Sequence, residues 1–186
     1  MKKALRKMGK TLAVLTLLAL VVAASADARD TLVRFKGGIG VIPVSSGQGT
    51  AATATVVNRN IVRGVQPPGQ PWVIADLRAE VKVDGRIRVD GRGLLLAGGN
   101  GVGTGGSGGS PTAVNQSVFA TLICEAAAPF TERNTTLTGV QLDDNGDFRI
   151  DDVLTPEPPA PADCTKPVLL IRNTAGAWFA AGIPAN

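Results

Sequence analysis

The residues best suited to chemistry lie in one acidic stretch, from Asp143 to Asp152. Asp143, Asn145 and Asp147 carry hard oxygen ligands of the kind that Ca²⁺ prefers. The spacing is not that of an EF-hand loop, because Gly146 stands at the fourth place and no Glu follows at the twelfth. The alternative is a solvated turn made of good turn residues. A Ca²⁺ site at these three residues is therefore one hypothesis, and a plain turn is the other.

Composition excludes the commonest catalytic groups. The chain has no His and no Tyr, which removes Ser-His-Asp and Cys-His catalysis as well as His-ligated zinc and blue-copper sites. Carboxylate chemistry remains open as an alternative, with or without a bound cation, and would draw on Asp143, Asp147, Asp151 and Asp152. No recognisable catalytic or nucleotide-binding motif is present. We therefore predict no catalytic and no cofactor-binding residue, and a non-enzymatic binding or structural role.

The first 26 residues have the three features of a cleavable secretory signal. The first ten residues include five basic residues and no acidic one. An apolar run of 14 residues follows, from Thr11 to Ala24. The small-residue site Ala24-Ser25-Ala26 follows, and Ala28 offers an alternative cleavage position. A helix needs about 20 residues to span a bilayer, so the run is too short for an anchor. We expect a periplasmic or extracellular protein without stable membrane insertion after cleavage.

Removal of the signal changes the electrostatic interpretation. The whole chain has 19 basic and 15 acidic residues, but five of the basic ones lie in the signal. The mature chain then carries 14 basic and 15 acidic residues, a net charge of −1. A nucleic-acid-binding protein should show a basic face or stripe. The nearly balanced charge therefore argues against a nucleic-acid partner. A protein or a cell-surface polymer remains as the possible partner.

The mature chain, residues 27–186, suits a single β domain. Its β-branched runs are short and separated by turn residues, which is typical of an all-β sandwich of the Ig-like or jelly-roll-like kind. A Gly-rich loop at 98–110 lacks the Lys-Ser/Thr ending of a phosphate-binding loop, and a Pro-rich loop spans 155–161. Trp72 and Trp178 are expected in the core. The predicted strands are Thr31–Phe35, Gly40–Pro43, Ala51–Asn58, Ile61–Gly64, Trp72–Val83, Arg86–Leu96, Gln116–Cys124, Thr135–Leu142, Phe148–Leu154, Pro167–Arg172 and Ala177–Ala181.

The two cysteines, Cys124 and Cys164, predict one disulfide. An even number of cysteines in an exported protein favours a structural bridge, which contributes about 2–4 kcal/mol. No Cys-x-x-Cys redox motif is present. The alternative is a pair of free thiols.

One hairpin can be predicted in register. A three-residue loop, Val83-Asp84-Gly85, places Gly85 at the left-handed position that such loops require. Other registers would place apolar residues opposite charged ones, or would place like charges opposite each other. The predicted pairs are Val81 with Ile87 and Ala79 with Val89 on one face, and Glu80 with Arg88 and Arg78 with Asp90 on the other. We interpret the charged face as a solvated sheet face rather than a binding site.

A second hairpin follows from the turn Asp144-Asn145-Gly146, with Gly146 left-handed. This register predicts Leu142 opposite Phe148 and Val140 opposite Ile150. It also opposes Asp143 to Asp147, and like charges opposed on a sheet are destabilising. Relief of that repulsion is the reason for the Ca²⁺ hypothesis.

Two segments carry a family resemblance: Pro71-Trp72-Val73-Ile74 and the run from Val83 to Leu96. With the signal, a strand ending in Cys124, the later acidic-Gly turn and Cys164 before Pro-Val-Leu-Leu, the chain resembles a group of uncharacterised exported bacterial proteins. The resemblance covers roughly Val62 to the end. It implies a two-cysteine β domain and a bacterial, exported origin, and it implies no activity and no site residues.

Overall fold

The computed structural model describes residues 30–48, 56–98 and 116–185. The predicted signal and all but the first residue of the Gly-rich loop lie outside these ranges. The chain divides into two compact units, Met1–Thr31 and Leu32–Asn186, and the architecture below is that of the second. Among the described residues, no helix is long and apolar enough to cross a membrane.

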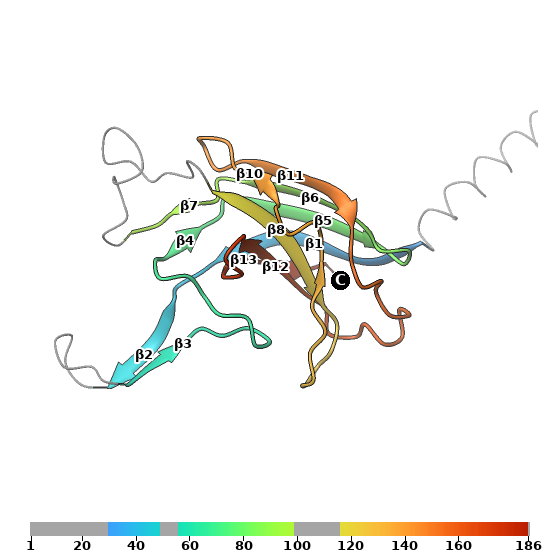
Figure 1. Ribbon diagram of the computed structural model, residues 1–186, viewed down its shortest axis with the longest axis horizontal. Helices are drawn as coiled ribbons and strands as arrows, with labels where there is room; N and C mark the ends of the chain where they lie inside the picture. The colour runs from blue at the N-terminus through green and yellow to red at the C-terminus, as the bar shows by residue number, and fades with distance from the viewer. Residues whose placement is uncertain (1–29, 49–55, 99–115, 186) are drawn as a thin grey trace, which may run out of the picture. The chain divides into compact units, whose positions relative to one another are not determined.

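The described residues form strands and connecting loops. Nine strands make one sheet with the order β10-β8-β12-β13-β1-β5-β6-β11, in which β9 also pairs with β8 (Figure 1). Two small sheets consist of β2 with β3 and of β4 with β7. The strands are β1 (Thr31–Gly40), β2 (Val44–Gln48), β3 (Val56–Arg59), β4 (Trp72–Val73), β5 (Asp76–Lys82), β6 (Arg86–Arg92), β7 (Leu95–Leu96), β8 (Ser117–Ile123), β9 (Arg133–Asn134), β10 (Val140–Gln141), β11 (Phe148–Val153), β12 (Val168–Asn173) and β13 (Trp178–Pro184).

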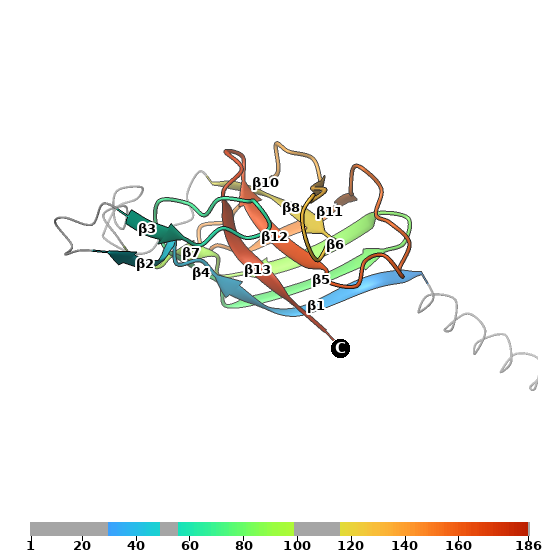
Figure 2. The same cartoon turned by 90° about the horizontal axis from the view of Figure 1, so that it is seen from below.

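The all-β class is confirmed, and the main sheet is nearly closed. Its two end strands, β10 and β11, are joined by the turn at 142–147, where the Asp143 N–H donates to the Asp147 carbonyl at 2.9 Å. Farther along, Asn134 and Thr155 exchange two backbone hydrogen bonds. One continuous sheet therefore surrounds the core, where the predicted sandwich would have two separate sheets. The strand β1 makes this possible because it lies between β13 and β5 (Figure 2).

The strands β5 and β6 bury one face only. Leu77, Ala79 and Val81 alternate with exposed or half-exposed charged residues, and Ile87 and Val89 do the same on β6. The observed pairs Val81–Ile87, Ala79–Val89, Glu80–Arg88 and Arg78–Asp90 are those predicted. Gly85 has a φ of 83° and its N–H donates to Lys82. The first hairpin is therefore confirmed in register.

The strands β8 and β12 are buried on both faces, and so is the first half of β13, Trp178 to Ala180. All residues from Val118 to Ile123 are buried, and so are those from Leu169 to Arg172. The segment after β8 folds back on it, since Thr121 pairs with Asn134. Trp72 stacks on Phe179 with ring centroids 4.0 Å apart, and the Trp178 indole N–H donates to the Asn60 carbonyl. Both tryptophans are core residues, as expected.

Cys124 and Cys164 form the predicted disulfide, with Cα atoms 4.5 Å apart, and neither thiol is free. The bridge ties the segment just after the Pro-rich loop to the residue that follows β8. A structural disulfide persists in oxidising compartments, so the protein belongs to an oxidising, exported environment.

Several strand predictions were too long. Trp72–Val83 divides at Ile74 and Ala75 into β4 and β5, and Arg86–Leu96 divides at Gly93 and Leu94. Gly93 is left-handed, with a φ of 63°, and such a conformation ends a strand. Of Thr135–Leu142 only Val140 and Gln141 are in a strand, and Ile61–Gly64 lies mostly in a turn closed by a Val62–Val65 bridge. The region at 51–55 lies outside the described residues.

Candidate functional site

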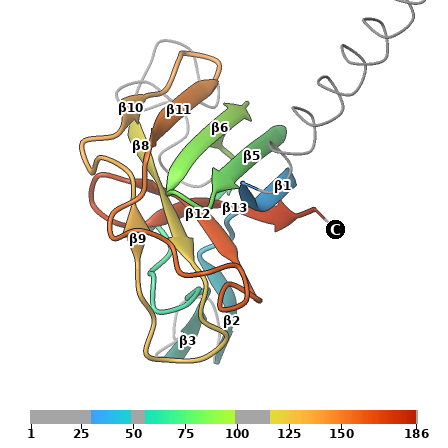
Figure 3. The same ribbon diagram turned by 90° about the vertical axis from the view of Figure 1, so that its right-hand side faces the viewer.

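The charged side chains that point outward from β5, β6 and β11 form a ladder of alternating sign, here called the charged face. One rung is Glu80, Arg88 and Asp151, and the next is Arg78, Asp90 and Arg149. Asp76 and Arg92 pair in a third rung. Within these rungs the sign alternates along each strand as well as across the strands. On β6 the alternation ends at Arg88, because the next outward residue, Arg86, is also basic. The three strands lie side by side in Figure 3.

Ion pairs hold most of these side chains in place. Arg88 contacts Asp151 at 2.9 Å and Arg78 contacts Asp76 at 3.1 Å. Arg34 of β1 extends the first rung by contacting Glu80 at 2.7 Å. The Arg149–Asp90 pair is looser, at 3.9 Å. All are largely exposed, and such pairs contribute about 0–1 kcal/mol each, so they order the face more than they stabilise the fold.

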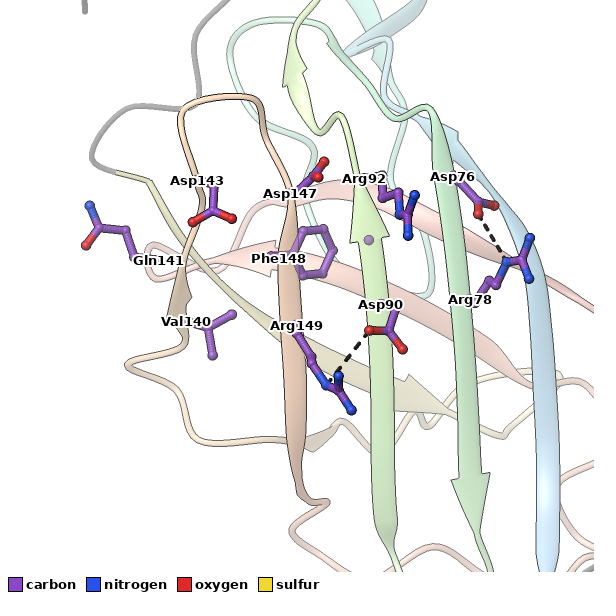
Figure 4. Close-up of a pocket in the computed structure, with 11 residues that line it drawn as sticks. Asp76, Arg78, Asp90, Arg92, Val140, Gln141, Asp143, Asp147, Phe148 and Arg149 are labelled. Carbon is purple, nitrogen blue, oxygen red and sulfur yellow. Dashed lines mark hydrogen bonds and ion pairs between the residues drawn. The ribbon is translucent and has the colours of Figure 1, made fainter.

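A trough of about 660 Å³ is hollowed into this face. Its walls combine charged groups of β5, β6 and β11 with side chains of β10 and the turn after it, as Figure 4 shows. A smaller hollow of about 230 Å³ adjoins it and shares Arg78 and Asp90. The trough is lined by Asp76, Arg78, Asp90, Gly91, Arg92, Val140, Gln141, Asp143, Asp147, Phe148 and Arg149.

The floor of the trough depends on Gly91. A Cβ atom at this position would overlap the Phe148 ring, which is paired with it across β6 and β11. Phe148 is only 6% exposed. The ring therefore packs where a side chain of residue 91 would lie, and the trough offers no exposed aromatic surface among its lining residues.

The turn at one end of the trough contains the three residues of the Ca²⁺ hypothesis. Asp147 Oδ1 accepts from the Gly93 N–H at 2.9 Å, and Oδ2 accepts from Asn145 Nδ2 at 3.1 Å. Asn145 Oδ1 in turn accepts from the Asp147 N–H at 3.1 Å. Protein donors therefore engage both oxygens of the Asp147 carboxylate, and these hydrogen bonds offset repulsion from Asp143 without a cation. In the part of the chain that the structure describes, no group of three or more His, Cys, Asp or Glu could hold a metal.

The second hairpin is confirmed at its turn but not along its strands. Gly146 is left-handed, with a φ of 80°, and its N–H donates to the Asp143 carbonyl. Beyond the turn, Val140 pairs with Val118 of β8 rather than with Ile150. Phe148 and Ile150 pair with Gly91 and Val89 of β6. The two strands separate because each has a longer partner on its other side.

The remaining carboxylates of the enzyme alternative do not converge with these. Asp151 pairs with Arg88 on the charged face, whereas Asp152 is the next residue and points to the other side of the strand. Asp152 Oδ2 accepts from the Thr136 N–H at 2.8 Å, which links β11 to the segment between β9 and β10. Burial acts to raise the pKa of Asp152, but hydrogen bonds from Thr136 and Val153 outweigh it and lower the pKa. An ionised carboxylate held in this way has a structural role and is unsuited to act as a general acid at neutral pH.

Two buried arginines were missed by the sequence analysis. Arg133 donates to Glu125 Oε1 at 2.9 Å, and this hydrogen bond lowers the pKa of Glu125 to about 2. Arg172 contacts Glu132 Oε2 at 2.5 Å and lies over the Phe119 ring, 5.4 Å from its centroid. The available signal was Arg172 directly after the apolar run Val168–Ile171. Both pairs hold the loops around β8, away from the trough.

Comparison of the chain with protein-family models, with curated proteins and with solved structures found no match.

Proposed function

We propose that this protein is an exported, non-enzymatic binding domain and that the trough is its binding site. The observation that carries the proposal is a trough of about 660 Å³ on a face whose charges are already ordered by ion pairs. Side chains held in place lose little conformational freedom when a ligand binds, and such preorganisation favours affinity.

The chemistry of the walls indicates a polar ligand that is longer than a small molecule. The trough continues into the smaller hollow at Arg78 and Asp90, so together they cross β11, β6, β5 and β1. Guanidinium and carboxylate groups along this path supply donors and acceptors in alternation. This arrangement supports a segment of a protein or of a surface polymer as the ligand. The predicted signal supports a periplasmic or extracellular location, and the family resemblance supports a bacterial one.

The proposal is tested by amide chemical-shift mapping with a defined set of probes. The set contains short charged peptides, cellohexaose as a neutral oligosaccharide, and polygalacturonate as a polyanion. We expect at least one probe to shift amides of β5, β6 and β11 around the trough. Probes that shift only amides elsewhere, or none at all, would overturn the proposal.

A steric variant makes the test specific. Gln141→Trp places a large side chain on an exposed wall position of the trough, and should weaken binding of the active probe at least about threefold by occupying its space. Glu157→Trp is the matched control, because Glu157 is exposed and does not line the trough. Equal effects of both variants would contradict binding in the trough.

A further inference from the structure

Arg92 and Asp143 differ from the other charged groups that line the trough. Asp76 and Arg78 contact each other, Asp90 contacts Arg149, and Asp147 accepts from Gly93. Within residues 30–48, 56–98 and 116–185, no ion pair or side-chain hydrogen bond is found for Arg92 or Asp143. A ligand can therefore engage these two groups without breaking an existing pair.

The two groups lie close enough to bind one ligand together. Phe148 pairs with Gly91, so Asp147, one residue earlier, lies beside Arg92, one residue later. Asp143 bonds to Asp147 on the side away from β6. Two strand spacings of about 4.8 Å therefore separate the Arg92 and Asp143 backbones, or about 10 Å. In an extended polypeptide, side chains two residues apart lie on the same face about 7 Å from each other, and flexible side chains cover the difference.

The charge pattern selects among polar ligands. Carboxylates lie on both sides of Arg92, at Asp76 and Asp147, so a polyanion meets repulsion as well as attraction. A polycation meets the same conflict at Arg78 and Arg149. Neutral sugars are commonly held on exposed aromatic rings, and Phe148, the aromatic residue that lines the trough, is only 6% exposed. A polypeptide that carries both signs avoids all three conflicts.

We propose that the trough binds an extended polypeptide segment with an acidic and a basic side chain two residues apart, the acid on Arg92 and the base on Asp143. This inference rests on the trough being the binding site. Side chains two residues beyond either of these face the ladder of alternating charges again, which adds hydrogen-bonding groups along the segment. Each exposed contact is weak, so the interaction is expected to be fast and readily reversible.

The test uses three acetylated and amidated pentapeptides of equal length. They are Ser-Glu-Ser-Lys-Ser, Ser-Glu-Ser-Glu-Ser and Ser-Lys-Ser-Lys-Ser, and binding to the mature chain is measured by chemical-shift titration. We expect the mixed-charge peptide to bind most tightly. Arg92→Glu should weaken its binding about fivefold and make the Lys-Ser-Lys peptide the preferred ligand. Asp143→Arg should make the Glu-Ser-Glu peptide the preferred ligand by the same reasoning.

Matched controls reverse charges outside the trough. Lys166→Glu and Asp163→Arg change the same net charge at exposed positions and should leave the preference for the mixed-charge peptide unchanged. A control that switches preference as strongly as its trough counterpart would overturn the inference, because net charge alone would then decide. Both trough substitutions are at exposed positions, and a retained amide spectrum shows that each variant is folded.

The outcomes separate this inference from the proposed function. Binding of cellohexaose or polygalacturonate in the trough, blocked by Gln141→Trp and tighter than that of any peptide, would overturn the peptide inference and leave the binding site in place. Peptide binding without any change of preference in Arg92→Glu and Asp143→Arg would also overturn it. Absence of any trough binding overturns both.

Discussion

The two halves of the main sheet use charge in different ways. On β5, β6 and β11, charged residues alternate with buried apolar ones, and their ion pairs lie in water. On β8 and β12, both faces are buried, and Arg172 lies within the packed interior next to Thr121 and Phe119. The first half therefore has an ordered but replaceable charge pattern. In the second half, the side chains of Arg133 and Arg172 are buried and hydrogen-bonded, so they belong to the packed interior.

The comparison assigns ligand binding and stability to different parts of the molecule. Exposed ion pairs contribute about 0–1 kcal/mol, so the charged face can change without loss of the fold. Removal of one partner of a buried pair costs about 3–5 kcal/mol, because the remaining group is left without compensation. Substitutions on β5, β6 and β11 should therefore reduce binding, whereas substitutions of buried groups on β8 and β12 should reduce the stability of the fold.

The largest expected effect is that of Arg172→Ala. It removes the contact with Glu132, the hydrogen bond from Nε to the Gly176 carbonyl at 2.8 Å, and packing on Phe119. We expect a loss of about 2–4 kcal/mol in the free energy of unfolding. It comes mainly from lost packing and hydrogen bonds, because the Glu132 carboxylate that remains is exposed to water. Arg88→Ala is the matched change on the charged face and should cost less than about 1 kcal/mol. Urea unfolding, followed by fluorescence of the buried tryptophans, measures both, and equal losses would remove the distinction between the halves.

Acid should weaken the buried half through Glu125. The hydrogen bond from Arg133 lowers the pKa of Glu125 from 4.5 to about 2. A carboxylate with a lowered pKa in the folded state stabilises the fold above the unfolded pKa, and this contribution is lost as the pH falls. Between pH 5 and pH 2, the advantage of the native chain over Glu125→Gln should therefore shrink, by about 2 kcal/mol.

The matched pair in the exposed half is Asp84 with Arg86. The side-chain hydrogen bond from Arg86 also lowers the pKa of Asp84, but this pair lies in water at the hairpin loop. Asp84→Asn should change the acid dependence less than Glu125→Gln does. Unfolding curves at several pH values show which of the two variants changes the acid dependence of stability more. A larger effect of Asp84→Asn would reverse the assignment of stability to the buried half.

Gly91→Ala tests the packing beneath the charged face. Alanine normally stabilises a strand relative to glycine, but here its Cβ overlaps the Phe148 ring. Overpacking of this kind costs about 1–3 kcal/mol. Gly69→Ala is the control, since nothing lies within 4 Å of the added atom. Addition of Phe148→Leu to Gly91→Ala should recover part of the loss, and a stabilising Gly91→Ala would show that the ring does not pack on residue 91.

The sequence predicted the half of the sheet in which local rules decide. In the hairpin of β5 and β6, Gly85 sets the loop, and the cross-strand charges allow one register. The disulfide and the burial of both tryptophans also follow from residue type and cellular compartment. Each of these predictions depends on residues close in sequence or on a single possible pairing.

The parts that sequence reasoning missed depend on contacts between distant segments. The turn at Gly146 was predicted, but the pairing of Val140 with Val118 was not, because nothing local shows that β8 competes with β11 for this strand. The charged face is solvated, as predicted. Its hollow was not predicted, because it depends on the turn packing against Gly93 and Leu94. Arg172 was missed because a run of apolar residues does not show which face of the sheet the next residue occupies.

The smallest effect on stability is expected at the turn that joins the end strands. Asp147→Ala removes the carboxylate that accepts hydrogen bonds from the Gly93 N–H and Asn145 Nδ2, and should cost about 1 kcal/mol. Asp143→Ala should cost almost nothing, since its carboxylate is exposed. We expect the same losses with and without millimolar Ca²⁺, measured by thermal unfolding. A rise in Tm with Ca²⁺ that disappears in Asp147→Ala would instead favour a metal site. The hydrogen bonds of Asp147 would then have to rearrange, because both of its oxygens are already engaged by protein donors.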